Sequence, residues 1–228
     1  MIITAISMRE VHATGMDTTE LSRYLPETTK EKLSRIINAA AYERSLLGEL
    51  LSRYSIHEFS GMDINSIRVH TGDKGKPYLD GYQGIHFNVS HSGDIVACAV
   101  SRSDVGIDVE HKRKVNLRVA ERFFSASEYQ DLMALAEPDR QEYFFLLWTI
   151  KESYLKAIGS GLTKNLNSFT VQKAGDKFIL TGDPYARSFS VKSYILPAGT
   201  CLSVCSMDGN FPDHVRMAGC KELVAAFG

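Results

Sequence analysis

The sequence of 228 residues has no excess of charge of either sign, because 26 basic residues face 27 acidic ones. Such a balance gives no overall field suited to nucleic acid or to an anionic membrane surface, so we expect neither as a partner. No apolar stretch approaches the roughly 20 residues of a membrane span, and the N-terminus, MIITAISMREVH, lacks the basic start of a signal peptide. We therefore expect a cytoplasmic protein.

Cysteine motifs are absent as well. The four cysteines form no C-x-x-C pair, and no histidines accompany them at the spacing of a zinc site. Three of them, Cys98, Cys201 and Cys205, lie in alternating apolar runs, where small buried side chains are more common than ligands or disulfides. At this length a chain can bury a core without disulfides. The sequence therefore predicts neither a zinc site nor a disulfide framework.

The most informative segment is VGIDVE at residues 105–110. Its alternation predicts a β-strand with Asp108 and Glu110 on one face and a row of valine and isoleucine on the other. Two carboxylates about 6.5 to 7 Å apart along a strand repel each other unless a cation lies between them. Mg²⁺ is the simplest such ion, because it prefers oxygen ligands and often shares its shell with phosphates. A solvated strand face is the alternative.

A long helix is expected to start near Pro138 and to end at Gly159, which suits a C-terminal cap. Trp148, Glu152 and Lys156 are spaced by four and so lie along one stripe of this helix. A Glu–Lys pair at that spacing is usually exposed, but this helix is apolar almost all round, which is typical of a buried element. A buried glutamate and lysine need partners, and a metal ion beside a phosphate would satisfy both.

Two further segments carry candidate anion ligands. FNVSHSG at 87–93 places Ser90 and His91 in a predicted tight turn between apolar strands, where hydroxyls, amides and an imidazole can converge. GKP at 75–77 holds Lys76 between residues that restrict the backbone. Each signal is weak alone, since a histidine in a turn is more often a surface residue. Basic residues near the first helix form either a phosphate patch or a solvated face: Lys30, Lys32, Arg35 and Arg44.

The predicted elements occur twice in the same order. A strand near Met1–Ser7 precedes one long helix or two in tandem after the Thr28-x-x-Glu31 capping box, and strands follow up to Ser101. After VGIDVE come helices, one of them behind the capping box Ser125-x-x-Glu128, and then four strand-like runs at 169–172, 177–180, 189–196 and 201–205. We therefore expect an α+β fold of two similar lobes, residues 1–104 and 105–228.

The ordered set of motifs resembles the 4′-phosphopantetheinyl transferase superfamily. It comprises GKP at 75–77, FNVSHSG at 87–93, GIDVE at 106–110, RFFS at 122–125 and WTIKESYLKAIGSGL at 148–162. The combination of G-I-D-x-E with W-x-x-K-E-S-x-x-K is the specific part of this resemblance. The length and two-lobed order are similar to the Sfp-type branch, whose members are pseudo-dimers within one chain. The resemblance thus implies a monomeric, pseudo-dimeric fold.

The resemblance also implies an activity. The expected enzyme moves the 4′-phosphopantetheine arm of coenzyme A onto a serine of an apo acyl or peptidyl carrier protein and releases adenosine 3′,5′-bisphosphate. Asp108, Glu110 and Glu152 would hold Mg²⁺, or Mn²⁺ in its place, and Lys156 would neutralise the pyrophosphate. Glu152 is our candidate base, directly or through a water molecule, so Glu152 and Lys156 form the expected catalytic pair.

Other coenzyme A contacts come from the same resemblance. They are expected from Lys32, Arg44, Ser45, Lys76, Ser90, His91 and Lys156. One departure is visible, because the family often has two lysines three apart at the start of the first long helix, where this chain has Thr29 and Lys32. One charge contact is therefore missing or comes from Lys30.

The segment HKRKVNLRVAER at 111–122 is locally basic, with a single acidic residue, Glu121. Carrier proteins of this system are typically acidic around their serine, so the segment is expected to form the docking surface; a solvated loop is the alternative. The five docking residues are Lys112, Arg113, Lys114, Arg118 and Arg122. Two rival functions are a metal-dependent phosphohydrolase acting on coenzyme A or a related pyrophosphate, and a non-catalytic coenzyme A-binding module.

Overall fold

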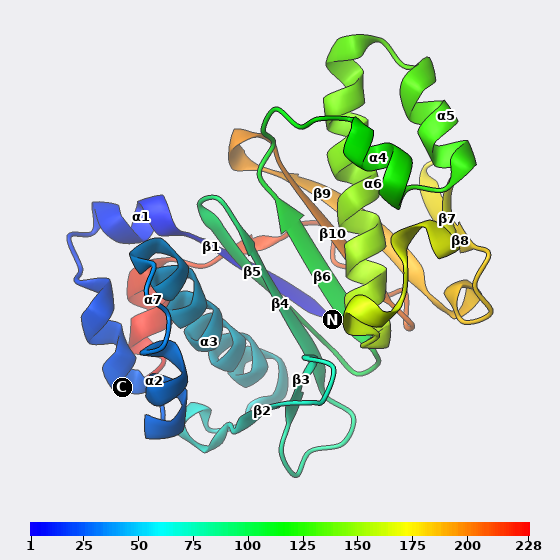
Figure 1. Cartoon of the computed structure of the whole chain (residues 1–228). Coiled ribbons are helices and arrows are strands. Elements are labelled where there is room, and N and C mark those ends of the chain that lie inside the picture. Colours follow the sequence, from blue (N-terminus) through cyan, green and yellow to red (C-terminus); the bar gives the residue numbers. More distant parts are fainter.

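The structure is a computed structural model that describes residues 1–228, except for the side chain of Leu162, the last residue of the motif at 148–162. Two sheets lie side by side (Figure 1). The first has the order β11-β1-β5-β4, formed by Arg216–Met217, Ile2–Ser7, Ile95–Ser101 and His86–Ser92. The second has the order β6-β10-β9-β8-β7, formed by Val105–Glu110, Thr200–Ser206, Ser190–Leu196, Lys177–Thr181 and Thr170–Ala174. A hairpin of β2 (Val69–Thr71) and β3 (Pro77–Leu79) stands apart.

One long helix packs on each sheet, α3 (Ala39–Ser60) on the first and α6 (Glu137–Ile158) on the second (Figure 1). The shorter helices are α1 (Met8–Ala13), α2 (Glu27–Leu33), α4 (Arg118–Phe123), α5 (Ala126–Ala134) and α7 (Cys220–Ala225). Each long helix buries its own hydrophobic cluster, and a third cluster draws residues from both sheets, among them Ala97 and Ile107. The third cluster joins the two lobes into one body.

Most element predictions agree with the structure. The box Ser125-x-x-Glu128 caps α5 in both directions, and α6 ends at Gly159 with a left-handed φ of 61°. All four cysteines are free and buried. The predicted cap at Thr28 is wrong, because α2 starts at Glu27 behind Pro26 and has no side-chain cap. Helix α2 ends at Leu33, and the side chain of Asn38 caps the start of α3, so the structure has two helices in tandem.

The end of the chain leaves the second lobe. Strand β11 pairs in parallel with β1, with Arg216 opposite Thr4, and α7 adds Leu223 to the core of the first lobe. Tyr54 of α3 donates a 2.8 Å hydrogen bond to Glu222 of α7. This last part of 105–228 therefore packs on the first lobe rather than on the second. A strand of two residues has no alternation from which its sheet could be predicted.

None of the helices that the structure describes combines the length and apolar character needed to cross a membrane.

Candidate active site

The site lies where the edge strands β4 and β6 meet beneath α6 (Figure 1). The close approach of α6 depends on Gly106, since a Cβ atom there would overlap the backbone of Ser153 and Ala157. Val105, Ile107 and Val109 are fully buried on the opposite face of β6 and anchor the strand, as the alternation predicted. The carboxylates of β6 therefore face the helix that carries Glu152 and Lys156.

Asp108, Lys156 and Ser90 form the centre of the site. The Nζ of Lys156 donates to Asp108 Oδ1 at 2.6 Å and to Ser90 Oγ at 3.0 Å. Ser90 donates in turn to Asp108 Oδ1 at 3.1 Å. Asp108 is 6% exposed, and its second oxygen, Oδ2, is buried without a hydrogen-bond partner among the described residues. A buried carboxylate oxygen without a partner is costly and marks a place for a cation.

Glu110 lies one step further along the strand and is held separately. Its Oε2 accepts hydrogen bonds from Ser92 at 2.8 Å and from Arg113 at 3.0 Å. Glu152 lines a cavity of about 300 Å³ together with Lys76 and Lys156. The structure thus brings Asp108, Glu110, Glu152 and Lys156 to one region from two elements.

Burial and mutual repulsion raise the pKa values of two of these carboxylates, Asp108 and Glu152. Burial raises the pKa of Asp108, an effect that Lys156 opposes and Glu110 reinforces. Burial also raises the pKa of Glu152, and the charges of Asp108 and Glu110 add to this while Lys156 counteracts it. A divalent cation would relieve the repulsion and favour the ionised forms of all three groups.

The donor set fits Mg²⁺ in chemistry but not yet in geometry. Among the side chains that the structure describes, no group of three His, Cys, Asp or Glu residues could by itself hold a metal ion. In this structure the ammonium of Lys156 lies against Asp108, and Glu110 accepts hydrogen bonds from Ser92 and Arg113. Carboxylate oxygens alone, one of them unpartnered, suit a hard ion that completes its shell with phosphate and water.

The predicted coenzyme contacts gather around two adjoining cavities. One, of about 400 Å³, is lined by Lys32, Ser45 and His91, and the cavity of about 300 Å³ is lined by Lys76 and Lys156. Both share Gly75, Pro77 and Val89 as walls.

Several of these residues already have partners within the protein. Lys76 donates to Asp104 Oδ1 at 2.7 Å and to the carbonyl oxygen of Ala157 at 2.5 Å. The Nζ of Lys32 lies 3.7 Å from Glu49 Oε1, and the Nζ of Lys30 lies 2.7 Å from Glu27 Oε1. A bound anion would have to compete with Asp104 for Lys76.

His91 is surrounded by positive charge. Desolvation lowers the pKa of His91, and Arg44 and Lys156 lower it further, although the residue keeps an exposed surface. Arg44 is therefore close enough to His91 to act on it electrostatically.

The predicted turn at 90–93 is wrong in its position. Ser90, His91 and Ser92 belong to β4, and the chain turns only at Gly93 and Asp94. Alternation of polar residues in FNVSHS could have shown the strand, but the glycine and serines favoured a turn. Sequence reasoning placed Ser92 only in the predicted turn and missed Asn88 and Asp104, and all three contact the site.

The predicted docking segment borders a groove of about 700 Å³ lined by Lys112, Arg113 and Lys114 and, from α6, by Arg140 and Gln141. Gln141 holds the segment in place through two hydrogen bonds with the backbone of Val115. Arg118 and Arg122 lie on α4 and do not line this groove.

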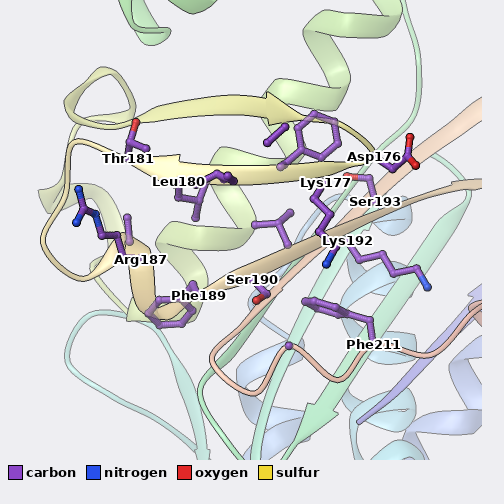
Figure 2. Close-up of a pocket in the computed structure, with 16 residues that line it drawn as sticks. Asp176, Lys177, Leu180, Thr181, Arg187, Phe189, Ser190, Lys192, Ser193 and Phe211 are labelled. Carbon is purple, nitrogen blue, oxygen red and sulfur yellow. The ribbon is translucent and has the colours of Figure 1, made fainter.

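A larger cavity, of about 920 Å³, lies elsewhere, between β8 and β9 (Figure 2). Its walls include Phe178, Phe189 and Phe211, and Asp176 is its only carboxylate. No predicted site residue lines it. The predicted site residues therefore gather at the seam where β4 and β6 meet rather than at this cavity.

Comparison with known proteins agrees with this geometry. The family described as the 4′-phosphopantetheinyl transferase superfamily matches residues 104–205, and the one described as 4′-phosphopantetheinyl transferase, N-terminal, matches residues 12–103. The chain is 34% identical over 203 residues to the 4′-phosphopantetheinyl transferase Sfp of Bacillus subtilis (strain 168), with 88% of this chain and 90% of that protein covered. The chain belongs to the 4′-phosphopantetheinyl transferase superfamily.

A second relative extends this result. The 4′-phosphopantetheinyl transferase psf-1 of Bacillus pumilus is 37% identical over 183 residues, which covers 80% of this chain and 78% of that protein. The protein is therefore an Sfp-type transferase with the predicted two-lobed α+β fold. These relatives give no support to the phosphohydrolase alternative.

Proposed function

We propose that this 4′-phosphopantetheinyl transferase takes the phosphopantetheine arm from coenzyme A and attaches it to a serine hydroxyl of an apo acyl or peptidyl carrier protein. The observation that carries the proposal is the Oδ2 of Asp108, which is buried without a partner among the described residues, beside Lys156, a residue that lines one of the two adjoining cavities. Carboxylates, a lysine and an anion-sized cavity are the groups that phosphoryl transfer from a pyrophosphate requires.

The residues divide the work of the reaction. The carrier serine oxygen forms a bond to the β-phosphorus, and the bond from that phosphorus to the bridging oxygen breaks, releasing adenosine 3′,5′-bisphosphate. Lys156 balances the negative charge that grows on this leaving group. Glu152 receives the proton of the serine hydroxyl, directly or through a water molecule, because it is the carboxylate one turn from Lys156 on α6.

Asp108, Glu110 and Glu152 would hold Mg²⁺, or Mn²⁺ in its place. When bound, the ion supplies positive charge against the pyrophosphate. Lys156 already binds Oδ1 of Asp108, so Oδ2 would be the atom of that carboxylate available to the ion.

The nucleotide of coenzyme A lies along the two adjoining cavities in this proposal. Lys32, Ser45 and His91 line one of them, and Arg44 adds charge beside His91. Lys76 and Ser90 reach the phosphates nearer Lys156, with Lys76 exchanging Asp104 for a phosphate oxygen.

The carrier docks on the basic segment at 111–122. The groove beside it adds Arg140 to the positive lining, which suits the acidic surface of a carrier. In this proposal the transferase acts as a monomer, because its two lobes already share a buried cluster within one chain. It acts in the cytoplasm, as the sequence led us to expect.

Incubation with coenzyme A, Mg²⁺ and a panel of apo carriers tests this function by intact-mass spectrometry. We expect one phosphopantetheine per carrier, lost when the acceptor serine is replaced by alanine. Release of phosphate or pantetheine phosphate in reactions without any carrier, and no mass gain with one, would favour hydrolysis instead.

A further inference from the structure

Strands β4 and β6 are the edges of their two sheets, yet they lie side by side. In the part of the chain that the structure describes, no backbone ladder joins them. Three side chains of β4 take its place. The backbone N–H of Ile107 donates to Asn88 Oδ1 at 3.0 Å, that of Val109 to Ser90 Oγ at 3.3 Å, and that of His111 to Ser92 Oγ at 3.1 Å.

The two serines of this row also hold the two carboxylates of β6. Ser90 donates to Asp108 Oδ1 at 3.1 Å, and Ser92 donates to Glu110 Oε2 at 2.8 Å. Each serine therefore binds one carboxylate with its single proton and the N–H of the following residue with a lone pair. Each serine thus holds both the backbone of β6 and one of its carboxylate side chains in place.

The two serine–carboxylate pairs, Ser90–Asp108 and Ser92–Glu110, differ in the cation that each carboxylate binds. Ser90 shares Asp108 with Lys156, whereas the other partner of Glu110 is Arg113, an exposed side chain. Removal of the Ser92 hydroxyl would leave Glu110 with Arg113 alone, and the carboxylate would then be free to turn toward the surface with it.

We propose that Ser92 is a positioning residue that orients Glu110, and that the row Asn88, Ser90 and Ser92 sets the register of β6 against β4. The inference rests on the metal role proposed for Glu110. Ser92 itself touches neither the metal nor the substrate; it acts through the carboxylate it holds. Groups that orient a metal ligand typically change metal affinity about 10- to 100-fold when they are removed.

The test measures binding of Mn²⁺ in the presence of coenzyme A and without carrier, by electron paramagnetic resonance of the free ion. Ser92→Ala should weaken Mn²⁺ binding about 10-fold or more, whereas Ser92→Thr, which keeps the hydroxyl, should bind nearly as the wild type does. The KM for coenzyme A should stay close to that of the wild type.

Ser101→Ala is the matched control, because Ser101 also donates from a strand of the first sheet to a carboxylate, Asp208, at 2.6 Å. It should shift the melting temperature about as much as Ser92→Ala while leaving Mn²⁺ affinity unchanged. In a Glu110→Gln background, Ser92→Ala should have no further effect on Mn²⁺ binding, since the serine acts through Glu110.

Two outcomes overturn the inference and are distinguishable. If Asp108→Ala loses Mn²⁺ binding but Ser92→Ala binds like the wild type, the positioning role is wrong and the metal site stands. If Asp108→Ala also binds Mn²⁺ normally, the metal site itself is wrong and the role of Ser92 falls with it.

Discussion

Lys156 and Asp108 form an ion pair of 2.6 Å across the boundary between α6 and β6. Lys156 keeps part of its side chain exposed, whereas Asp108 is buried. The pair therefore connects the solvent-facing cavity with the interior of the site, and the lysine opposes the rise that burial causes in the pKa of Asp108. This contact links the two sequence motifs, G-I-D-x-E and W-x-x-K-E-S-x-x-K, that identify the family.

We expect Asp108→Ala or Glu110→Ala to abolish transfer while the protein stays folded. Each change removes a proposed metal ligand and relieves repulsion among the three carboxylates. Turnover with an apo carrier, measured across a Mg²⁺ titration, should stay at background, and a thermal melt should remain cooperative. Near-normal turnover of either variant at low Mg²⁺ contradicts the metal assignment.

Substitution of Glu152 or of Lys156 should slow the transfer step while coenzyme A still binds. Glu152→Gln removes the proposed base, so kcat should fall by at least about 10²-fold. Lys156→Ala should also lower kcat, because the charge that it balances grows in the transition state. Calorimetric titration should show that coenzyme A still binds both variants, because Lys76, His91 and the basic residues of the first helix anchor the nucleotide in this proposal. If both variants turn over normally, the stripe of Trp148, Glu152 and Lys156 on α6 has a structural role and no catalytic one.

The sequence was sufficient to predict the catalytic strand and helix, because their signals are local. Alternation placed Asp108 and Glu110 on one face, and the spacing of four placed Glu152 and Lys156 on one stripe. It could not predict that Gly106 lets α6 approach β6, since that contact joins residues about fifty apart and appears only in the packed structure.

The seam of β4 and β6 was beyond sequence reasoning for a different reason. Ser90 and Ser92 look like turn residues, and their use as substitutes for a backbone ladder depends on a second edge strand that only the fold brings near. The pairing of β11 with β1 could not be predicted either, because a strand of two residues shows no alternation of apolar and polar side chains.

Charge reversal in the docking segment should weaken carrier binding more than coenzyme A binding. Arg113 contacts Glu110 and is therefore unsuitable, so the better variant is Lys114→Glu with Arg118→Glu. Rim charges mainly govern encounter, so the carrier KM should rise and its dependence on salt should become weaker. Lys173→Glu with Lys177→Glu, on the far strands β7 and β8, is the control and should leave the carrier KM unchanged. An unaltered KM and salt response in the first variant would place docking elsewhere.

Gly106→Ala should destabilise the protein and disrupt the site together. The added methyl group would overlap the backbone of Ser153 and Ala157, and backbone cannot move aside as a side chain can. We expect a loss of about 3 kcal/mol or more in the free energy of unfolding. Gly219→Ala is the control, because the space around Gly219 is open, and it should cost less than about 1 kcal/mol. Chemical denaturation measures both, and equal stabilities would contradict the close packing of α6 on β6.

The stability of the metal-free protein should depend on pH through Glu152. Burial and the charge of Asp108 raise the pKa of Glu152 in the folded state, so the folded protein retains this proton to a higher pH than the unfolded chain does. The stability that Glu152 contributes is therefore complete below its ordinary pKa and is lost as pH rises through the raised value. Glu152→Gln cannot lose a proton and should lack this dependence.

Calorimetric melting in a metal chelator, from about pH 4 to about pH 8, compares the two proteins over this window. The wild type should lose stability relative to Glu152→Gln as pH rises, and the difference should level off once Glu152 is fully ionised. Mg²⁺ with coenzyme A should narrow the difference at the upper end, because a bound cation favours the charged carboxylate of the wild type. A difference that stays constant across the whole range would mean that the pKa of Glu152 is the same in the folded and unfolded states.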